Sequence, residues 1–320
     1  MLEFNIEQTT SDVFHEDITW DMLIVGGGPA GMNGAIYARR KGMNVGIITA
    51  EIGGQLHNTT DIDNYLGFPL IKGPELSDRF LKHVNHLDVP IIKDVFVQSV
   101  SREGTLYRLL LSDGRSVVTK TILYAAGGSP RKLNVPGENE FSGLGVSYCA
   151  TCDAPFYKDK HVIVAGGGNS AADGVMDLTP WANKITVVHR SQWRADKILL
   201  DKFKDIDKLT VHLETQILKI HGDDRVTGVE VLDKKTKKTR IINADGILIE
   251  IGTIPNSKPL KDLVDMNQVG EIIVDENQRT SLPGIYAAGD VTQNPHKQIV
   301  ISAAEGAKAA LSARIYLNHS

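Results

Sequence analysis

The sequence predicts an α/β protein with two doubly wound domains, because one strand–glycine motif–helix–strand unit occurs twice in the chain. The first unit begins with the apolar run 21–25, and the second begins with the apolar run 161–165. In each unit a glycine-rich motif, a helix-like segment and a second β-rich run follow. The stretch from the first glycine to the end of that second run has the same length in both units, 26–49 and 166–189.

The composition is that of an ordinary globular protein of one large or two average domains. The chain has 320 residues, 42% of them hydrophobic and 23% charged, with a net charge of −4. This mildly acidic balance is atypical of nucleic-acid-binding proteins. The start of the chain is acidic and shows no signal peptide, and glycines and a proline interrupt the most apolar stretch, 22–38. We therefore predict a cytoplasmic protein that binds neither nucleic acid nor membrane.

The first motif fits G-x-G-x-x-G, the pattern of a dinucleotide-binding turn. Gly26 allows the tight turn, Gly28 lets the backbone approach a pyrophosphate, and Gly31 permits close helix–strand packing. The following helix offers free N–H groups and a positive dipole end to the phosphates. A lone motif of this kind also fits an ordinary glycine-rich loop, but its position between strand, helix and strand favours nucleotide binding.

The second motif fits G-x-G-x-x-A and comprises Gly166, Gly168, Asn169, Ser170 and Ala171. A unit that binds NAD ordinarily has an acidic residue near the end of its second strand, where it takes the ribose 2′-OH. That place holds His189 and Arg190 here, with Arg194 close behind. Because positive charge suits a 2′-phosphate, the second unit favours NADPH and leaves FAD to the first. The same basic residues also fit an ordinary surface loop.

Two further strand-and-turn segments support FAD binding by the first unit. The segment 122–131 is a strand that runs into a turn of small residues, and the segment 284–290 is another that ends at Gly289 and Asp290. A carboxylate on a tight turn can accept hydrogen bonds from ribityl hydroxyls. A Gly-Asp pair alone is only a turn signal, so this interpretation depends on the first unit.

The rest of the chain is predicted to be mostly antiparallel β structure. The segment 93–118 predicts a meander with a hairpin turn at 113–114, and the segment 211–251 has the same character. The lysine-rich run 234–240 fits a solvated hairpin tip. Apolar periodicity predicts a helix over 299–317.

Cys149 and Cys152 are the only cysteines, and their spacing is that of a redox dithiol. Two intervening residues permit a reversible small-ring disulfide. A zinc site requires more soft ligands than this region supplies, so no metal is expected, and an inert structural pair is the remaining alternative. Asp153 follows directly and can shuttle the proton that dithiol release requires. It can also cap a helix, and the two roles are compatible.

Together these residues resemble the low-molecular-weight thioredoxin reductases, which are FAD- and NAD(P)-dependent disulfide oxidoreductases. The matching segments are 26–31, 53–56, 149–153, 166–171, 251–256 and 287–290. The resemblance implies three-layer ββα domains, with an FAD-binding domain of residues 1–130 and 257–320. An NAD(P)H-binding domain of residues 131–256, carrying the redox disulfide, is inserted into it. The resemblance also implies a homodimer.

The resemblance further implies a thioredoxin reductase mechanism and assigns residues to it. Hydride passes from NADPH to FAD and then to the Cys149–Cys152 disulfide, which exchanges with a thioredoxin-like protein. Cys152 is nearest the flavin, Cys149 is the interchange thiol, and Asp153 is the general acid. FAD is assigned to Gly26, Gly28, Pro29, Ala30, Gly31, Gly53, Gly54, Gln55, Leu56, Asn64, Ala126, Gly127, Gly289, Asp290, Lys297, Gln298 and Ile299. NADPH is assigned to Gly166, Gly168, Asn169, Ser170, Ala171, His189, Arg190 and Arg194.

One departure from the family pattern leaves the electron donor open. The family's basic box reads H-R-R-x-x-x-R-A, whereas Ser191 replaces the second arginine here and the loop is one residue shorter. Losing one phosphate partner weakens NADPH binding by about 1.5–3 kcal/mol. The electron donor can therefore be NADPH, NADH or another molecule. A dithiol oxidase that does not use pyridine nucleotide is a further alternative.

Two further alternatives come from other classes of protein. The flavoprotein component of alkyl hydroperoxide reductase looks similar but carries a long N-terminal extension, whereas only about 20 residues precede the first strand here. A non-catalytic FAD-binding redox sensor is the other alternative. The intact cysteine pair and Asp153 argue against a sensor.

Overall fold

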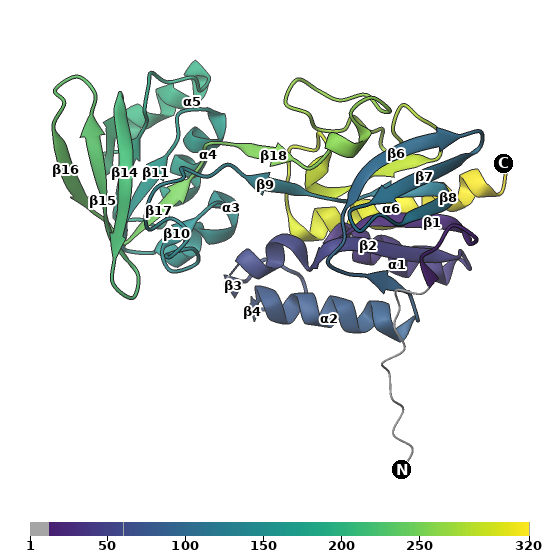
Figure 1. Cartoon of the computed structure of the whole chain (residues 1–320). Coiled ribbons are helices and arrows are strands. Elements are labelled where there is room, and N and C mark those ends of the chain that lie inside the picture. The colour runs from purple at the N-terminus through teal and green to yellow at the C-terminus, as the bar shows by residue number, and fades with distance from the viewer. Residues whose placement is uncertain (1–12, 60, 320) are drawn as a thin grey trace, which may run out of the picture. The chain divides into compact units, whose positions relative to one another are not determined.

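The computed structural model describes residues 13–59 and 61–319 and divides the chain into two compact units (Figure 1). Unit 1 is discontinuous and comprises Met1–Ser129 and Ile254–Ser320, whereas unit 2 is the intervening Pro130–Thr253. The sequence predicted boundaries after residues 130 and 256, within one and three residues of these positions. At the boundary, β9 (Gly128–Pro130) pairs with β18 (Thr253–Pro255).

Within the described residues, unit 1 contains a seven-stranded sheet in the order β5-β2-β1-β8-β7-β6, with β19 also paired to β8. Its parallel strands are β5 (Ile91–Ile92), β2 (Val45–Ile52), β1 (Thr19–Gly27), β8 (Ser116–Tyr124) and β19 (Ile285–Ala287). The antiparallel strands are β6 (Val97–Glu103) and β7 (Leu106–Leu111), which pair with each other and with β8. The predicted meander over 93–118 is therefore confirmed. A small ribbon of β3 (Asp61–Ile62) and β4 (Ile71–Lys72) lies outside the main sheet.

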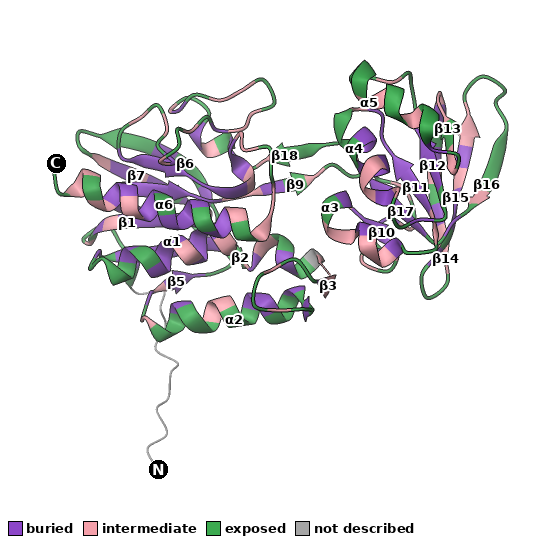
Figure 2. Ribbon diagram, turned by 180° about the vertical axis from the view of Figure 1, so that it is seen from behind, coloured by how far each residue is buried: buried purple, intermediate pink, exposed green. Residues whose placement is uncertain are grey.

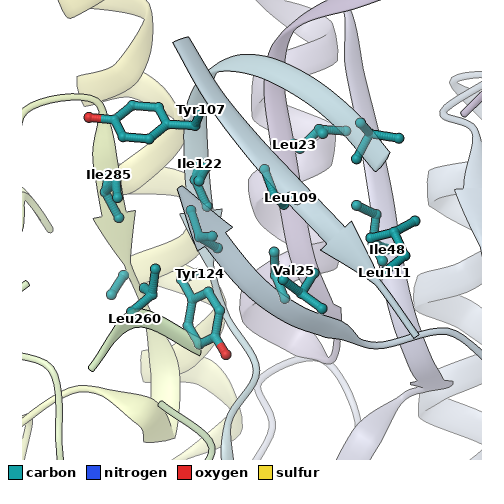
Figure 3. Close-up of a cluster of buried hydrophobic side chains, with 14 of the residues drawn as sticks. Leu23, Val25, Ile48, Tyr107, Leu109, Leu111, Ile122, Tyr124, Leu260 and Ile285 are labelled. Carbon is teal, nitrogen blue, oxygen red and sulfur yellow. The ribbon is translucent and has the colours of Figure 1, made fainter. Parts of the chain in front are cut away.

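Alternate residues of β1 pack into two different hydrophobic cores, one on each face of the sheet. Unit 1 therefore has three layers, with the sheet in the middle. Met22 and Ile24 pack in the core that includes α1 (Pro29–Arg40) and α6 (Ile299–Leu317). Leu23 and Val25 pack on the other face with residues of the antiparallel strands (Figure 3). Among its described residues, this unit also contains the α-helix α2 (Gly73–His86). A strand buried on both faces needs apolar residues throughout, which explains the continuous apolar run of β1.

Helices α1 and α6 pack with their backbones in close contact. A Cβ built on Gly306 would lie 1.9 Å from the carbonyl oxygen of Ala30, and one built on Gly34 would lie 3.2 Å from the carbonyl oxygen of Gly306. The Asn33 amide also donates a 2.7 Å hydrogen bond to the Ala303 carbonyl. The C-terminal helix is thereby held against the helix of the first glycine motif.

Helix α6, with 19 residues, confirms the helix predicted over 299–317. It carries Glu305, Lys308 and Arg314 among its small apolar residues. Across residues 13–59 and 61–319, no helix combines the length and low polarity needed to cross a bilayer.

Unit 2 combines a parallel sheet with an antiparallel one. Its described parallel strands run in the order β10 (Val146–Ser147), β17 (Gly246–Ile249), β11 (His161–Ala165), β12 (Lys184–Val188) and β13 (Leu209–His212). The antiparallel sheet comprises β14 (Thr215–Gly222), β15 (Val226–Asp233) and β16 (Thr239–Asn243). Ile163 of β11 packs toward the antiparallel sheet, whereas Val162 and Val164 pack with α4 (Asn169–Leu178). Two short helices, α3 (Ala150–Asp153) and α5 (Lys197–Asp201), complete the unit.

The expectation of antiparallel structure throughout 211–251 is wrong at both ends of that segment. Strand β13 pairs in parallel with β12, and β17 pairs in parallel with β10 and β11. All four residues of β17 are buried, and a short fully buried strand has no alternation by which its pairing can be recognised. The lysine-rich run 234–240 is exposed and lies at the β15–β16 hairpin (Figure 2), as expected.

Gly306→Ala is expected to destabilise unit 1 by at least about 2 kcal/mol, because the new methyl group would overlap the Ala30 backbone. Chemical unfolding followed by circular dichroism measures the change. The matched control is Lys308→Ala, at an exposed position of the same helix, which should stay within about 0.5 kcal/mol of the parent chain. A Gly306→Ala protein as stable as the parent would contradict the packing of α1 on α6.

Candidate functional site

The first glycine motif turns from β1 into α1 through positions that exclude side chains. Gly26 has φ of +116°, and a Cβ there would lie 2.2 Å from the Ala125 carbonyl oxygen. A Cβ on Gly31 would lie 1.9 Å from the Gly26 carbonyl oxygen. Gly28, by contrast, faces open space, with no atom within 4 Å of its Cβ position. The backbone at Gly28 is thus bare and accessible beside the start of α1, as a pyrophosphate site requires.

Other predicted residues of unit 1 gather around this turn. The Gly53 N–H donates to the Gly27 carbonyl at 2.8 Å, and the Cβ position of Gly54 lies 3.8 Å from Gly28 Cα. The Cβ position of Gly289 lies 3.2 Å from Ala30 Cβ. Segments from three parts of the chain therefore meet at the first motif.

Asp290 lies in this cluster and is held by two side chains. Gln55 Nε2 donates to the Gly128 carbonyl at 2.8 Å and to Asp290 Oδ2 at 3.3 Å. Ser302 donates to the other Asp290 oxygen at 3.3 Å. Burial raises the pKa of Asp290 above its ordinary value, although Lys297 opposes that effect. Asp290 is thus an acceptor fixed in place, which suits a polyhydroxyl ligand.

Two residues that the sequence analysis missed support the same turns. Thr49 Oγ1 accepts from the Gly27 N–H at 2.9 Å and donates to the Glu51 carbonyl at 2.6 Å. Buried Glu305 accepts from the Gly289 N–H at 2.7 Å and from the Asn294 amide. Neither residue belongs to a glycine motif, and each is far in sequence from the turn that it stabilises.

The remaining residues assigned to FAD lie at the edges of this region. Asn64 donates to Gln298 at 3.4 Å, and Lys297 forms a 3.0 Å ion pair with Glu271. Leu56 is buried in a small apolar cluster against which Ile299 packs. The others form the start of α1 and the turn after β8: Pro29, Ala30, Ala126 and Gly127.

The second motif repeats this geometry at the end of β11. A Cβ on Gly166 would lie 2.2 Å from the Glu250 carbonyl oxygen and 2.7 Å from Ala171 Cβ. Gly168 again faces open space at the start of α4. Asn169 is tied to Asp196 by two 2.8 Å hydrogen bonds, while exposed Ser170 is the next residue of α4.

A basic cluster follows β12 beside this motif. His189 is buried against Gly167 and lies 3.0 Å from the Ser191 hydroxyl. Burial lowers the pKa of His189, and the charges of Arg194 and Arg190 lower it further. The salt bridges of the described residues include neither arginine.

Lys234 joins this cluster and was not identified from the sequence. Its ammonium group donates to the Arg190 carbonyl at 3.0 Å. It lies at the start of the lysine-rich hairpin, far from the motif in sequence. Arg190, Arg194 and Lys234 are thus all close enough to His189 to lower its pKa.

The cysteine pair forms a disulfide in unit 2, with a Cα–Cα distance of 5.4 Å. We call residues 147–153 the redox loop. Ser147 accepts a hydrogen bond from the Cys149 N–H at 3.2 Å and donates one to the Asp153 carboxylate. The Cys152 N–H points at Cys149 Sγ, 3.3 Å away. Asp153 makes no side-chain cap to the helical turn that follows it, so Ser147 rather than capping orients its carboxylate.

Three more acidic residues anchor the redox loop. Glu138 accepts from the Tyr148 hydroxyl at 3.0 Å, and Asp177 accepts from the Thr151 hydroxyl at 3.0 Å. Glu250 accepts from the Ala150 N–H at 3.2 Å. Burial raises the pKa of Glu250 to about 7, and the negative charges of Asp177 and Asp173 reinforce the shift. No motif marked these residues, and Glu250 is separated from Ala150 by 100 positions.

These arrangements define what the two units can do chemically. Each offers a bare glycine backbone at a helix start, and unit 2 adds a reversible disulfide beside an oriented carboxylate. In the part of the chain that the structure describes, no group of three or more His, Cys, Asp or Glu side chains is arranged to hold a metal ion.

Comparison with known proteins places this arrangement among disulfide oxidoreductases. A profile of the pyridine nucleotide-disulphide oxidoreductase family matches residues 20–307. Thioredoxin reductase from Streptococcus pyogenes is similar with a TM-score of 0.90 and 39% identity, covering 94% of this chain and 99% of that one. Thioredoxin reductase from Giardia duodenalis gives a TM-score of 0.88 at 30% identity, with the same coverage.

Curated relatives include the F component of alkyl hydroperoxide reductase. The protein of this name in Staphylococcus aureus is 37% identical over 305 residues, which is 95% of this chain. The match spans 60% of the length of that relative.

Glu250→Gln is expected to stabilise the protein at alkaline pH. The pKa of Glu250 is raised from 4.5 to about 7, so its contribution to stability falls as pH rises through this interval. Removing the charge should therefore add about 2–3 kcal/mol more at pH 8.5 than at pH 5. Chemical unfolding at the two pH values measures this difference. An equal effect at both values would show that Glu250 is not a buried carboxylate with a raised pKa.

Proposed function

The chain belongs to the pyridine nucleotide-disulphide oxidoreductase family, and on this premise we propose that it acts as a thioredoxin reductase. The observation that carries the proposal is the Cys149–Cys152 disulfide beside Asp153, in the same unit as a second dinucleotide motif. The net reaction converts a protein disulfide, NADPH and one proton into a protein dithiol and NADP⁺. The similar solved thioredoxin reductases support this choice of partner. We also propose that the protein is a homodimer and that it is cytoplasmic.

Unit 1 has the features that FAD requires. The bare backbone at Gly28 suits the pyrophosphate, and the fixed carboxylate of Asp290 suits hydroxyl groups of the ribityl chain. When bound, FAD supplies the two-electron relay between pyridine nucleotide and disulfide. The protein's part is to hold the phosphates at the start of α1 and to keep Asp290 in place through Gln55 and Ser302.

The redox loop carries out the thiol chemistry. Two electrons, which a bound flavin would supply, break the Cys149–Cys152 bond. The Cys149 thiolate then attacks the partner's disulfide, which releases one partner sulfur and forms a mixed disulfide. Cys152, the cysteine that the family resemblance assigns to the flavin side, attacks the mixed disulfide, releases the second partner sulfur and restores the Cys149–Cys152 bond. The partner sulfurs leave as thiolates and need protons to become thiols, and Asp153 is the proposed donor. The Ser147 hydroxyl holds the carboxylate of Asp153 while also accepting from the Cys149 N–H. Donor and interchange cysteine are thus oriented by one side chain.

NADPH is the proposed electron donor, supported by the cations at the end of β12. Arg190, Arg194 and Lys234 all act on His189, which packs against Gly167 of the second motif, and their charges can pair with a 2′-phosphate. Ser191, in the place of a family arginine, favours the alternative that NADH or another donor serves instead.

A second candidate is a reductase component of the alkyl hydroperoxide reductase type. The 37% identity to the Staphylococcus aureus protein favours it. If the chain reduced no thioredoxin but supported NAD(P)H-dependent consumption of an alkyl hydroperoxide together with a partner protein, this second function would replace the first.

Cys149→Ser is expected to abolish thioredoxin turnover while leaving FAD bound and reducible, because only the interchange thiol is lost. Turnover is measured by NADPH oxidation with thioredoxin, and flavin reduction by anaerobic bleaching. The matched control is Lys158→Ala, at an exposed position shortly after the loop, which retains both sulfurs and should retain turnover. Full turnover in Cys149→Ser would remove Cys149 from the mechanism.

Arg190→Ala is expected to weaken NADPH binding about ten- to a hundredfold and to leave NADH binding nearly unchanged, because only NADPH carries the 2′-phosphate. Anaerobic titration of the flavin with each nucleotide measures both affinities. Lys238→Ala, in the exposed run 234–240, is the control and should change neither. If the parent chain were reduced equally well by NADH, the choice of NADPH would be wrong, and if neither nucleotide reduced it, a different donor would be indicated.

A further inference from the structure

We propose that Glu250 is a positioning residue of the redox loop and that its carboxyl group controls how much of the reduced Cys149 is thiolate. This inference rests on the proposed function of the loop in disulfide exchange. It concerns the equilibrium in which the Cys149 thiol releases one proton to become a thiolate, after the disulfide has been reduced.

The main chain of Glu250, just after β17, is fixed against the end of β11 and the first glycine of the second motif. Its N–H donates to the Ala165 carbonyl at 2.8 Å, immediately before the motif begins. Its own carbonyl oxygen is the atom that would lie 2.2 Å from a Cβ on Gly166. The position of Glu250 is therefore set by the same close approach that shapes the nucleotide turn.

The side chain of Glu250 reaches from this fixed point to the redox loop. Oε1 accepts the Ala150 N–H at 3.2 Å, and Ala150 follows Cys149 directly in the chain. The Cβ position of Gly174 on α4 lies 3.5 Å from Glu250 Cγ, so the side chain is confined on that flank as well. A carboxyl group is thus held one residue from the proposed interchange cysteine.

The charged groups around Glu250 are mostly acidic. Helix α4 contributes Asp173 and Asp177, and Asp177 also accepts from Thr151 of the loop. The redox loop, which Glu250 contacts at Ala150, also carries the cysteine pair and Asp153, whose carboxylate Ser147 holds. The exposed Arg131 lies beside Gly252, two residues beyond Glu250, and strand β11 carries its only titratable side chain, His161, at its far end. Burial, reinforced by the charges of Asp177 and Asp173, raises the pKa of Glu250 to about 7.

The consequence for Cys149 follows from the sign of the charge. A carboxylate near a thiol disfavours the thiolate and raises the thiol pKa, whereas a protonated carboxyl group lacks this effect. Because the pKa of Glu250 is about 7, its carboxyl group becomes negatively charged as the pH rises through neutrality, which is the range in which thiol exchange takes place. Since the thiolate is the attacking species, Glu250 restrains the reactivity of Cys149 as pH increases.

The test measures Cys149 alkylation by iodoacetamide between pH 5.5 and pH 9.5. It uses the full chain with its cofactor, reduced by a phosphine, and tandem mass spectrometry separates modification at Cys149 from that at Cys152. Neither nucleotide nor thioredoxin is added, so the result is independent of whether the chain proves to be a thioredoxin reductase. Glu250→Gln removes the charge and keeps an acceptor for the Ala150 N–H, whereas Glu250→Leu removes both. Asp207→Asn is the control, an exposed acid before β13 at the opposite edge of the parallel sheet.

The expected result is that both Glu250 variants lower the midpoint of the alkylation profile by about one pH unit. Below the midpoint but above the pKa of Glu250, where the parent carries the carboxylate, this corresponds to an increase in rate of about tenfold. Asp207→Asn should follow the parent profile. The proposal is overturned if the Glu250→Gln profile superimposes on that of the parent, and a change confined to Glu250→Leu would show that only the hydrogen bond matters.

Discussion

Both units depend on a strand end at which one backbone approaches another more closely than any side chain permits. In unit 1 the approach joins Gly26 to Ala125, and in unit 2 it joins Gly166 to Glu250. Each approach brings the end of the strand before the motif against the end of a neighbouring parallel strand. The N-terminus of the following helix is thereby set at the carboxyl edge of the sheet, where nucleotides bind in folds of this kind. The bare backbones at Gly28 and Gly168 are consequences of this geometry.

In unit 2 the same constraint connects the nucleotide turn with the redox chemistry. The carbonyl of Glu250 contacts the Gly166 position, while its carboxyl group holds Ala150 in the redox loop. One residue therefore fixes two functional segments that are adjacent in space and separate in sequence. Ser147 has a comparable double role within the loop, because it contacts both the Cys149 N–H and the Asp153 carboxylate.

The electrostatic environments of the two functional regions of unit 2 are opposite. Cations lie near His189 at the end of β12, where a phosphate is expected, and they add to burial in lowering the pKa of His189. Acids lie around the redox loop, where Glu250 and Asp177 both accept hydrogen bonds from it. The separation is consistent with the proposed function, in which one region attracts a nucleotide and the other moderates thiol reactivity.

The sequence by itself determined the features that depend on local spacing. The equal repeats 26–49 and 166–189, the two glycine turns, the C-x-x-C pair and the helix 299–317 all follow from residues close together in the chain. Only the tertiary structure decided which distant side chains complete these sites, such as Glu250 at Ala150 and Lys234 at Arg190. It also placed β13 and β17 in the parallel sheet, against the sequence-based expectation. The physical reason is that strand pairing and long-range hydrogen bonds depend on which segments the fold brings together. A local sequence pattern does not indicate which distant segment will pair with it.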